Sequence, residues 1–154
     1  MKILKFEFFI ILFLIPFFFL NSSQKSVLIK IGSNNFLVKL AETEQEKNDG
    51  LMFKRKFKDS NGMLFIYKNP RQVNFWMKNT FIPLAIIFID ENKRIKKIGI
   101  GNILSEEVVS SQEPVIAVLE IPITCVKILG LELGDKVFWS ENFDKSDKNI
   151  YPCL

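Results

Sequence analysis

The chain contains no histidine among its 154 residues. Catalysis by a Ser-His or Cys-His pair needs an imidazole as its base, and many metal sites need one as a ligand. Both classes are therefore excluded. The two cysteines, Cys125 and Cys153, are too few and too widely separated in sequence for a structural zinc site. We accordingly expect neither a metal nor a cofactor.

The two cysteines leave two alternatives open. In an oxidising compartment, a disulfide between Cys125 and Cys153 would tie the C-terminal tail to the domain. Cys125 also lies in the apolar sequence Ile123-Thr-Cys-Val, which is typical of a buried free thiol. A disulfide requires Cα atoms within about 7 Å of each other, and a sequence does not give that distance.

The chain also lacks an apolar run long enough to span a bilayer comfortably as a helix. Its longest run, from Phe8 to Leu20, has 13 residues, whereas a spanning helix needs about 20. Lys2 and Lys5 precede this run, and small or polar residues follow it up to Ser23. This order predicts a signal peptide over residues 1–23, with an uncleaved anchor as the alternative. We therefore expect an exported protein, periplasmic, secreted or in the cell envelope, that contacts the membrane only through its N-terminal segment.

The charge is mildly basic, with 21 Lys and Arg against 17 Asp and Glu. This surplus is too small to indicate a dedicated nucleic-acid protein, so no nucleic-acid partner is predicted. The densest basic stretches, 54–56 and 93–97, are interpreted as solvated loops or strand faces. Beyond the leader, residues 24–142 have the length of one domain, and residues 143–154 are predicted to be a C-terminal tail that is polar up to Asn149.

The domain reads as short strands separated by turns. The predicted strands cover residues 27–31, 36–40, 63–67, 73–77, 84–90, 94–100, 115–121 and 136–140. Two short helices are predicted, one at 44–48 behind a capping box of Thr43 and Glu46, and one at 124–129. The wholly apolar segment 85–89 is typical of a central strand covered on both faces. These elements predict a mainly β fold, a small antiparallel β-sandwich or jelly-roll-like barrel with one or two short helices.

One cluster of residues suggests a binding surface. Alternation along a strand at 73–77 places Trp76 and Lys78 on the face opposite to Met77, and Asn79 and Thr80 follow directly. An exposed indole beside hydrogen-bond donors suits a sugar ring or an extended peptide. In the alternative interpretation, Trp76 packs under a loop, and Asn79 and Thr80 only shape a turn.

Three acids adjoin predicted strands. Asp90 and Asp135 lie at turns, where a carboxylate stabilises the bend. Glu120 lies between Leu119 and Ile121 inside an apolar strand, so we expect it to be buried and paired with a Lys or Arg. If Asp90 and Glu120 shared a cleft, two carboxylates could hydrolyse a glycosidic bond.

Several longer motifs resemble one family. They are Gly50-Leu-Met-Phe-Lys54, Gly62-Met-Leu-Phe-Ile66, Phe75-Trp-Met-Lys-Asn-Thr80, Ile82-Pro-Leu-Ala-Ile-Ile-Phe-Ile-Asp90, Val118-Leu-Glu120 and Leu133-Gly-Asp-Lys-Val137. In this order they resemble the family called domain of unknown function 192, and the resemblance covers essentially everything after Leu37. It implies a compact β-sandwich of jelly-roll type, often found behind an export signal in bacteria and archaea. It implies no established reaction.

The chain departs from that family pattern at two places. Ala85 stands where the family usually has Asp, which removes the one carboxylate expected beside the segment from Trp76 to Thr80. If that acid performs chemistry in relatives, this protein cannot perform it in the same way. The sequence Pro122-Ile-Thr-Cys125 also replaces the small residues and Gly that are usual before the second short helix.

The leading hypothesis is an exported envelope domain without catalytic activity. It would act as a binding or accessory module for an envelope protein, peptide or polymer. Its candidate ligand-binding residues are Trp76, Lys78, Asn79, Thr80 and Glu120. The alternative is a carboxylate-based hydrolase or lyase acting on an envelope carbohydrate. A purely structural domain, the third hypothesis, predicts no pocket near Trp76.

Overall fold

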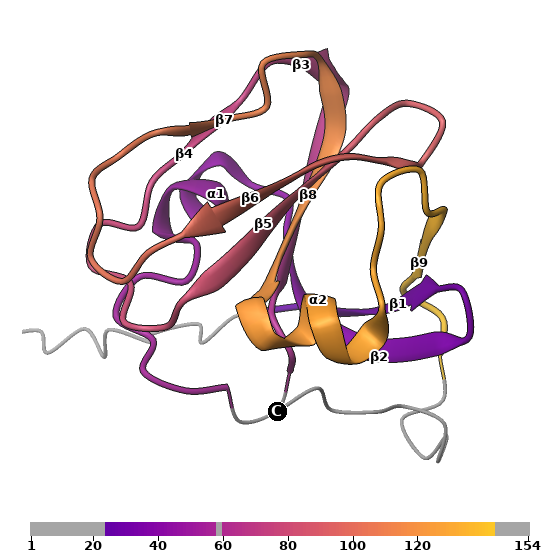
Figure 1. The fold of residues 1–154 in the computed structure, drawn as a ribbon, viewed down its shortest axis with the longest axis horizontal. Coiled ribbons are helices and arrows are strands. Elements are labelled where there is room, and N and C mark those ends of the chain that lie inside the picture. The colour runs from indigo at the N-terminus through magenta and orange to yellow at the C-terminus, as the bar shows by residue number, and fades with distance from the viewer. Residues whose placement is uncertain (1–23, 58–59, 144–154) are drawn as a thin grey trace, which may run out of the picture.

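A curled sheet of seven strands, a separate pair of short strands and two short helices make up the described part of the computed structural model (Figure 1). The structure describes residues 24–57 and 60–143. The predicted signal peptide, Cys153 and nearly all of the predicted C-terminal tail lie outside these ranges. Within them, no helix is long and apolar enough to cross a membrane.

All eight predicted strands are present, although the fourth is short. The strands are β1 (Ser26–Ile31), β2 (Asn34–Ala41), β3 (Met63–Arg71), β4 (Asn74–Phe75), β5 (Leu84–Ile89), β6 (Ile95–Gly101), β7 (Val109–Ser110), β8 (Val115–Pro122) and β9 (Val137–Ser140). Helix α1 spans Glu44–Asp49, and α2 spans Ile123–Leu129. The sequence did not predict β7, which pairs only with the two-residue strand β4.

The large sheet has the order β6-β5-β8-β3-β2-β1-β9. Its neighbouring strands are antiparallel except β2 and β3, which run parallel. The segment between these two strands, which includes α1, is long enough for the crossover connection that a parallel pair needs. At one end the sheet curls until its two edges meet, through a bridge between Arg94 and Lys136. There the Ile95 N–H donates to the Asp135 carbonyl at 2.9 Å, and the Val137 N–H donates to the Lys93 carbonyl at 2.8 Å. The mainly β prediction is confirmed, and the sheet forms a half-barrel.

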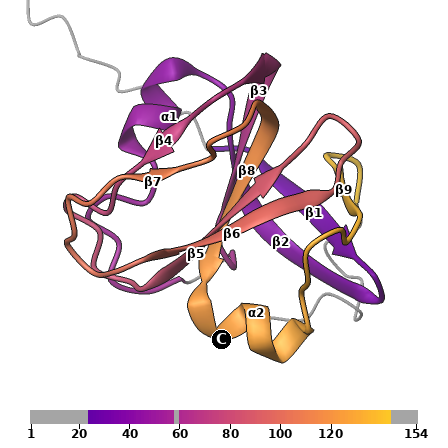
Figure 2. The same ribbon diagram turned by 45° about the horizontal axis from the view of Figure 1, so that its top comes forward.

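Strands β5 and β8 contribute side chains to two separate cores. Ala85 and Ile87 point into a first cluster beneath α2, whereas Leu84, Ile86 and Phe88 point into a second cluster beside β4 and β7. Figure 2 shows α2 on one side of these strands and α1, β4 and β7 on the other. All six residues of β5 are buried. The prediction of a central strand covered on both faces is therefore confirmed.

Local hydrogen bonds hold the ends of the elements as predicted. Thr43 Oγ1 accepts from the Glu46 N–H at 3.2 Å, and the Glu46 carboxylate accepts from the Thr43 N–H at 2.9 Å, which completes the capping box of α1. Asp90 Oδ1 accepts from the N–H groups of Asn92 at 2.9 Å and Arg94 at 2.8 Å, so it stabilises the β5–β6 turn.

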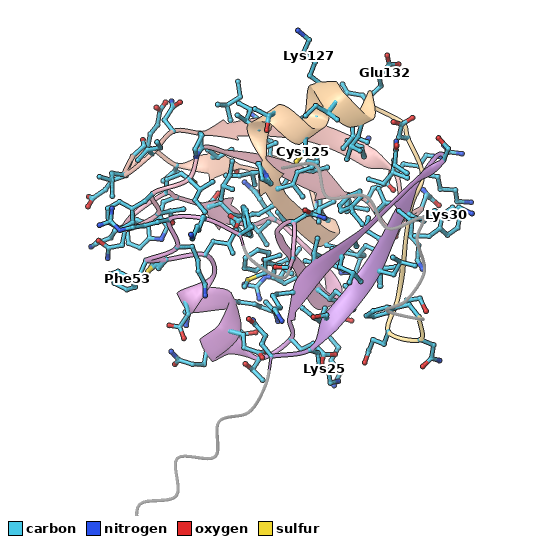
Figure 3. All side chains as sticks on the ribbon, turned by 90° about the horizontal axis from the view of Figure 1, so that it is seen from below. Lys25, Lys30, Phe53, Cys125, Lys127 and Glu132 are labelled. Carbon is cyan, nitrogen blue, oxygen red and sulfur yellow. The ribbon has the colours of Figure 1, made fainter. Side chains whose placement is uncertain are left out.

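Three further details concern the region around α2. Asp135 Oδ2 accepts from the Glu132 N–H at 2.9 Å, which is the turn role predicted for it. The helix ends at Gly130, whose φ of 61° is left-handed. Cys125 is fully buried and disulfide-bonded, so it is not the free thiol of the second alternative. In Figure 3, Cys125 points from α2 into the molecule, whereas Lys127 points outward.

Candidate functional site

A cavity of about 530 Å³ opens between α1, β3 and the β4 segment, and Glu120 of β8 also lines it. The α1 side of the cavity continues through Gly50, Leu51 and Met52. Its complete lining consists of Glu44, Lys47, Asn48, Asp49, Gly50, Leu51, Met52, Phe65, Tyr67, Arg71, Gln72, Val73, Asn74, Phe75, Trp76, Thr80 and Glu120. A hollow of this size is in the range of small-ligand sites.

Glu120 is the buried acid of this cavity. Pairing across the sheet places it opposite Ile86 of β5 and Met63 of β3, and it is only 4% exposed. Burial raises its pKa to about 8, because the ionised carboxylate loses its hydration. Among the described residues, no Lys or Arg forms an ion pair with it, so the predicted pairing is wrong. The carboxyl avoids the cost of a buried charge by staying largely protonated near neutral pH.

Tyr67 provides a second titratable group on the cavity wall. Its pKa rises to about 12, mainly because the phenol is partly buried. Lys47 Nζ lies 5.2 Å from the centre of its ring, and the Arg71 guanidinium lies 5.8 Å from it. Deeper in the cavity, the rings of Phe65 and Phe75 meet edge to face at 5.0 Å. The wall is thus aromatic, with cations flanking the phenol.

Trp76 forms an exposed part of the cavity lining. It is 46% exposed, and Lys78 Nζ lies 5.0 Å from the centre of its ring. Met77, the residue between them, is fully buried in the second cluster. The predicted alternation of faces therefore holds, although the regular strand is limited to Asn74 and Phe75. Trp76 does not pack beneath a loop, as the alternative interpretation required.

The two residues that follow have different positions. Thr80 is 4% exposed and lines the cavity. Asn79 does not line it; its φ of 56° is left-handed, and its carbonyl accepts from the Phe53 N–H at 2.7 Å. Of the five predicted ligand-binding residues, Trp76, Thr80 and Glu120 share the cavity. Lys78 contacts the indole, and Asn79 shapes a turn.

The acid pair proposed for hydrolysis does not share this cavity. Asp90 lies beyond the last residue of β5, does not line the cavity and holds the turn described above. Two other acids do line it, Glu44 and Asp49, both on α1. Glu44 accepts from Lys47 Nζ at 3.1 Å, and Asp49 accepts from Gln45 Nε2 at 2.9 Å. Within 24–57 and 60–143, no group of three or more acids, cysteines or histidines could hold a metal ion.

Ala85 lies on the opposite side of β5 from the cavity. It pairs with Ile121, its side chain belongs to the first cluster, and it is fully buried. Neighbouring residues of a strand point to opposite faces, so position 85 and position 86 cannot face the same core. The expectation that an acid at position 85 would sit beside the Trp76–Thr80 segment is therefore wrong. Its replacement by Ala removes nothing from the cavity.

Residues of α1 and β3 that the sequence pattern did not indicate complete the cavity. Tyr67 and Arg71 were not singled out, although Phe65 and Tyr67 alternate along a predicted strand. Four of the quoted motifs do supply cavity residues, namely those at 50–54, 62–66, 75–80 and 118–120. The missing information was the parallel pairing of β2 with β3, which brings the end of α1 next to the face of β3.

Comparisons with known proteins place this fold among uncharacterised relatives. A protein of Sinorhizobium meliloti 1021, provisionally described as a transcription regulator, has a similar structure, with a TM-score of 0.69 and 33% identity over 78% of this chain and 96% of its own. A protein of unknown function from Novosphingobium aromaticivorans DSM 12444 has a TM-score of 0.66 and 36% identity, over 74% of this chain and 84% of its own. No curated protein matches the chain.

The family comparison covers nearly the whole half-barrel. The family model DUF192, described as an uncharacterized ACR, matches residues 27–139. The match begins at residue 27, ten residues before Leu37, after which the motifs indicated a resemblance. It therefore also includes most of β1 and the start of β2. The predicted resemblance is thereby confirmed, and the chain belongs to the DUF192 family.

Proposed function

We propose that this chain is an exported cell-envelope domain that binds a ligand in the cavity bounded by Trp76, Thr80 and Glu120 without transforming it. One observation supports the proposal most strongly. Residues far apart in sequence, an exposed indole and a buried carboxyl, line the same solvent-reachable cavity. In a purely structural domain, a buried carboxyl beside an open space of about 530 Å³ would lower the stability of the fold without serving any purpose.

The cavity suits a ligand rich in hydroxyl or amide groups. A largely protonated Glu120 can donate one hydrogen bond and accept others, and the Thr80 and Tyr67 hydroxyls can do the same. The exposed indole of Trp76 offers a flat apolar surface for stacking. These features favour a sugar unit of an envelope polymer or an extended peptide segment.

A carboxylate-based hydrolase or lyase is the second candidate, and the raised pKa of Glu120 favours it. A carboxyl that stays protonated near neutral pH can act as a general acid on a glycosidic oxygen. The reaction also needs a second carboxylate as base or nucleophile. Only Glu44 and Asp49 line the cavity with it in the described part of the chain, and both are engaged by neighbours on α1. Binding is therefore the function we prefer.

Two features support export. The N-terminal segment has the order of charges and apolar residues typical of a secretory signal. Cys125 is disulfide-bonded, and disulfides persist mainly in oxidising compartments. The test is cell fractionation of the full chain followed by mass spectrometry of its N-terminus. Recovery of the protein only in the cytosol, with residues 1–23 attached, would contradict this part of the proposal.

The binding proposal can be tested with defined probes. We suggest titrating the purified protein with cell-wall glycan fragments and with extended peptides, by calorimetry, before and after Trp76→Ala. Loss of the stacking surface should weaken binding about tenfold. Trp139→Phe is the matched control, because Trp139 lies on β9 and packs against the first cluster, away from the cavity. Unchanged affinity in a folded Trp76→Ala protein would exclude the site.

Glycan turnover distinguishes the second candidate. If the protein releases sugar fragments, Glu120→Gln should abolish the release, because an amide cannot donate the required proton. Binding without turnover, retained in Glu120→Gln, supports the binding function instead.

A further inference from the structure

Five large apolar side chains are exposed together at the loop end of the molecule. We define the loop end by Phe53, Trp76, Ile103, Leu104 and Val108, which are 71%, 46%, 49%, 50% and 58% exposed. They come from three connections, which precede β3, join β4 to β5, and join β6 to β7. Soluble proteins seldom expose so many large apolar residues in one region without a partner.

Backbone hydrogen bonds hold these three connections side by side. The Phe53 N–H donates to the Asn79 carbonyl at 2.7 Å, and the Leu104 N–H donates to the Thr80 carbonyl at 3.0 Å. Phe75 pairs with Val109, so continuing that register by one residue brings Trp76 opposite Val108. Figures 1 and 2 both show the connections after β4 and β6 at the same end of the molecule. The loop end is thus one surface with fixed geometry.

Basic residues border this apolar surface. Lys54, Arg55 and Lys56 follow Phe53 directly and are exposed, and Lys78 is exposed beside Trp76. The Arg55 guanidinium lies 4.2 Å from the centre of the Phe81 ring, which keeps its charge at this end. Glu106 and Glu107 are the acids of the β6–β7 connection. Four cations against these two acids leave the surface with a positive surplus, which complements an anionic partner.

The chain outside the structure enters at the same place. Gln24, the first described residue, lines a shallow hollow together with Phe53, Lys54, Arg55 and Phe57. The 23 residues before it include the apolar run from Phe8 to Leu20. A segment with this composition is inserted in a bilayer during export. Phe53 of the loop end thus lies near the start of the described chain, to which the predicted export segment is joined.

We infer that the loop end docks on the surface of a bilayer that contains anionic phospholipid. Phe53, Ile103 and Leu104 would enter the interface between headgroups and acyl chains, and the neighbouring Lys and Arg side chains would contact the phosphates. Trp76 suits the same depth, because indole prefers the membrane interface. Docking competes with any ligand that stacks on Trp76, because the same indole also lines the cavity. It adds a membrane contact to the one expected from the N-terminal segment.

The experiment uses Trp76 as a depth reporter in the protein as cells produce it from the full chain. Trp76 and Trp139 are the two tryptophans, so Trp139→Phe leaves Trp76 alone. The variant is mixed with vesicles of phosphatidylglycerol and phosphatidylcholine that carry bromine on the upper acyl chain. We expect loss of Trp76 fluorescence with these vesicles and much less loss with phosphatidylcholine alone. This readout serves whether or not residues 1–23 are retained.

Two further pairs of substitutions distinguish docking through the loop end from nonspecific hydrophobic adsorption to the vesicles. Adding Phe53→Ser and Leu104→Ser to the Trp139→Phe variant should largely abolish the loss of Trp76 fluorescence. The reason is that two large apolar side chains no longer enter the membrane interface. Adding Ile128→Ser and Leu133→Ser instead should leave the loss of Trp76 fluorescence unchanged. These two residues are similarly exposed but belong to α2 and the segment that follows it, which are not part of the loop end. Trp76 fluorescence that brominated anionic vesicles leave unchanged overturns the inference. Self-association through the loop end without quenching, seen by sedimentation in the absence of lipid, overturns it as well.

Discussion

The two faces of β5 and β8 have the same backbone and opposite character. On the face beneath α2, Leu119 and its neighbours form a closed apolar core. On the other face, one residue further along β8, Glu120 lines an open cavity. The same two strands thus provide an apolar core on each side, and only the second side also has a polar cavity in the described structure. Most of the stability should come from the first face, and the capacity to bind from the second.

This difference matches the distribution of unusually placed side chains, which lie on the cavity side and not in the first cluster. The first cluster contains only apolar side chains in low-exposure positions. The cavity side holds the acid with the most strongly raised pKa, Glu120, together with the buried Thr80 and the partly exposed Trp76. Perturbed acids and exposed aromatics are features of binding sites more often than of packing cores. The following substitutions separate the two faces.

The largest effect is expected in the first cluster. Leu119→Ala should lower the free energy of unfolding by about 2–5 kcal/mol, because a fully buried side chain is removed from a closed core. Urea denaturation followed by circular dichroism measures the change. The matched control is Leu133→Ala, at a residue that is 65% exposed, where a change within about 0.5 kcal/mol is expected. Equal losses in the two variants would show that the face beneath α2 is not the main core.

The next effect concerns the disulfide at Cys125. Cys125→Ser should cost about 2–4 kcal/mol, because the cross-link no longer restricts the unfolded chain. Thermal unfolding with and without a reducing agent provides the measurement. Reduction should lower the melting temperature of the wild type and leave that of the variant unchanged. If reduction affects neither protein, the cross-link does not stabilise the domain.

On the cavity side, Glu120 should make stability depend on pH. Its folded pKa of about 8 is above the ordinary value of 4.5, so the folded state binds more protons than the unfolded state between these values. The free energy of unfolding should therefore fall as the pH rises through this window, by up to about 1.4 kcal/mol per pH unit, and level off above it. Urea denaturation at pH 5, 7 and 9 measures this slope.

Glu120→Gln provides the matched control for that slope. The amide has nearly the same shape and does not titrate, so its pH dependence should lack this contribution, and the variant should exceed the wild type in stability at pH 9. A wild type whose stability is flat between pH 5 and 8 would mean that Glu120 is ionised and solvated in the folded protein.

The smallest effect is expected at the helix that walls the cavity. Thr43→Ala removes the side chain that caps α1 and should cost about 1 kcal/mol. The control is Thr124→Ala, because Thr124 is exposed and forms no cap of α2. Hydrogen exchange should show faster opening of α1 in Thr43→Ala, with protection of β5 and β8 unchanged. Faster exchange throughout β5 would instead mean that the two faces are not energetically separable.

Local features of this protein were predictable because neighbouring residues alone produce them. The capping box of Thr43 and Glu46, the Asp90 turn and the buried strand at 85–89 all follow from short stretches of sequence. Shortening of the 73–77 strand was not predictable, because its partner within the described residues is β7, whose two residues showed no strand pattern. Part of the candidate site was foreseen, since Trp76 and Thr80 lie in one motif and Glu120 lies in another.

The sequence by itself determined a mainly β domain with its turns, caps and central strand, since these depend on spacing within a few residues. Only the tertiary structure decided that Ala85 faces away from the cavity, that Tyr67 and α1 complete it, and that Glu120 is buried without a described cationic partner. The physical reason is strand register. A shift of one residue reverses the face of every side chain, and register is set by pairing between distant segments.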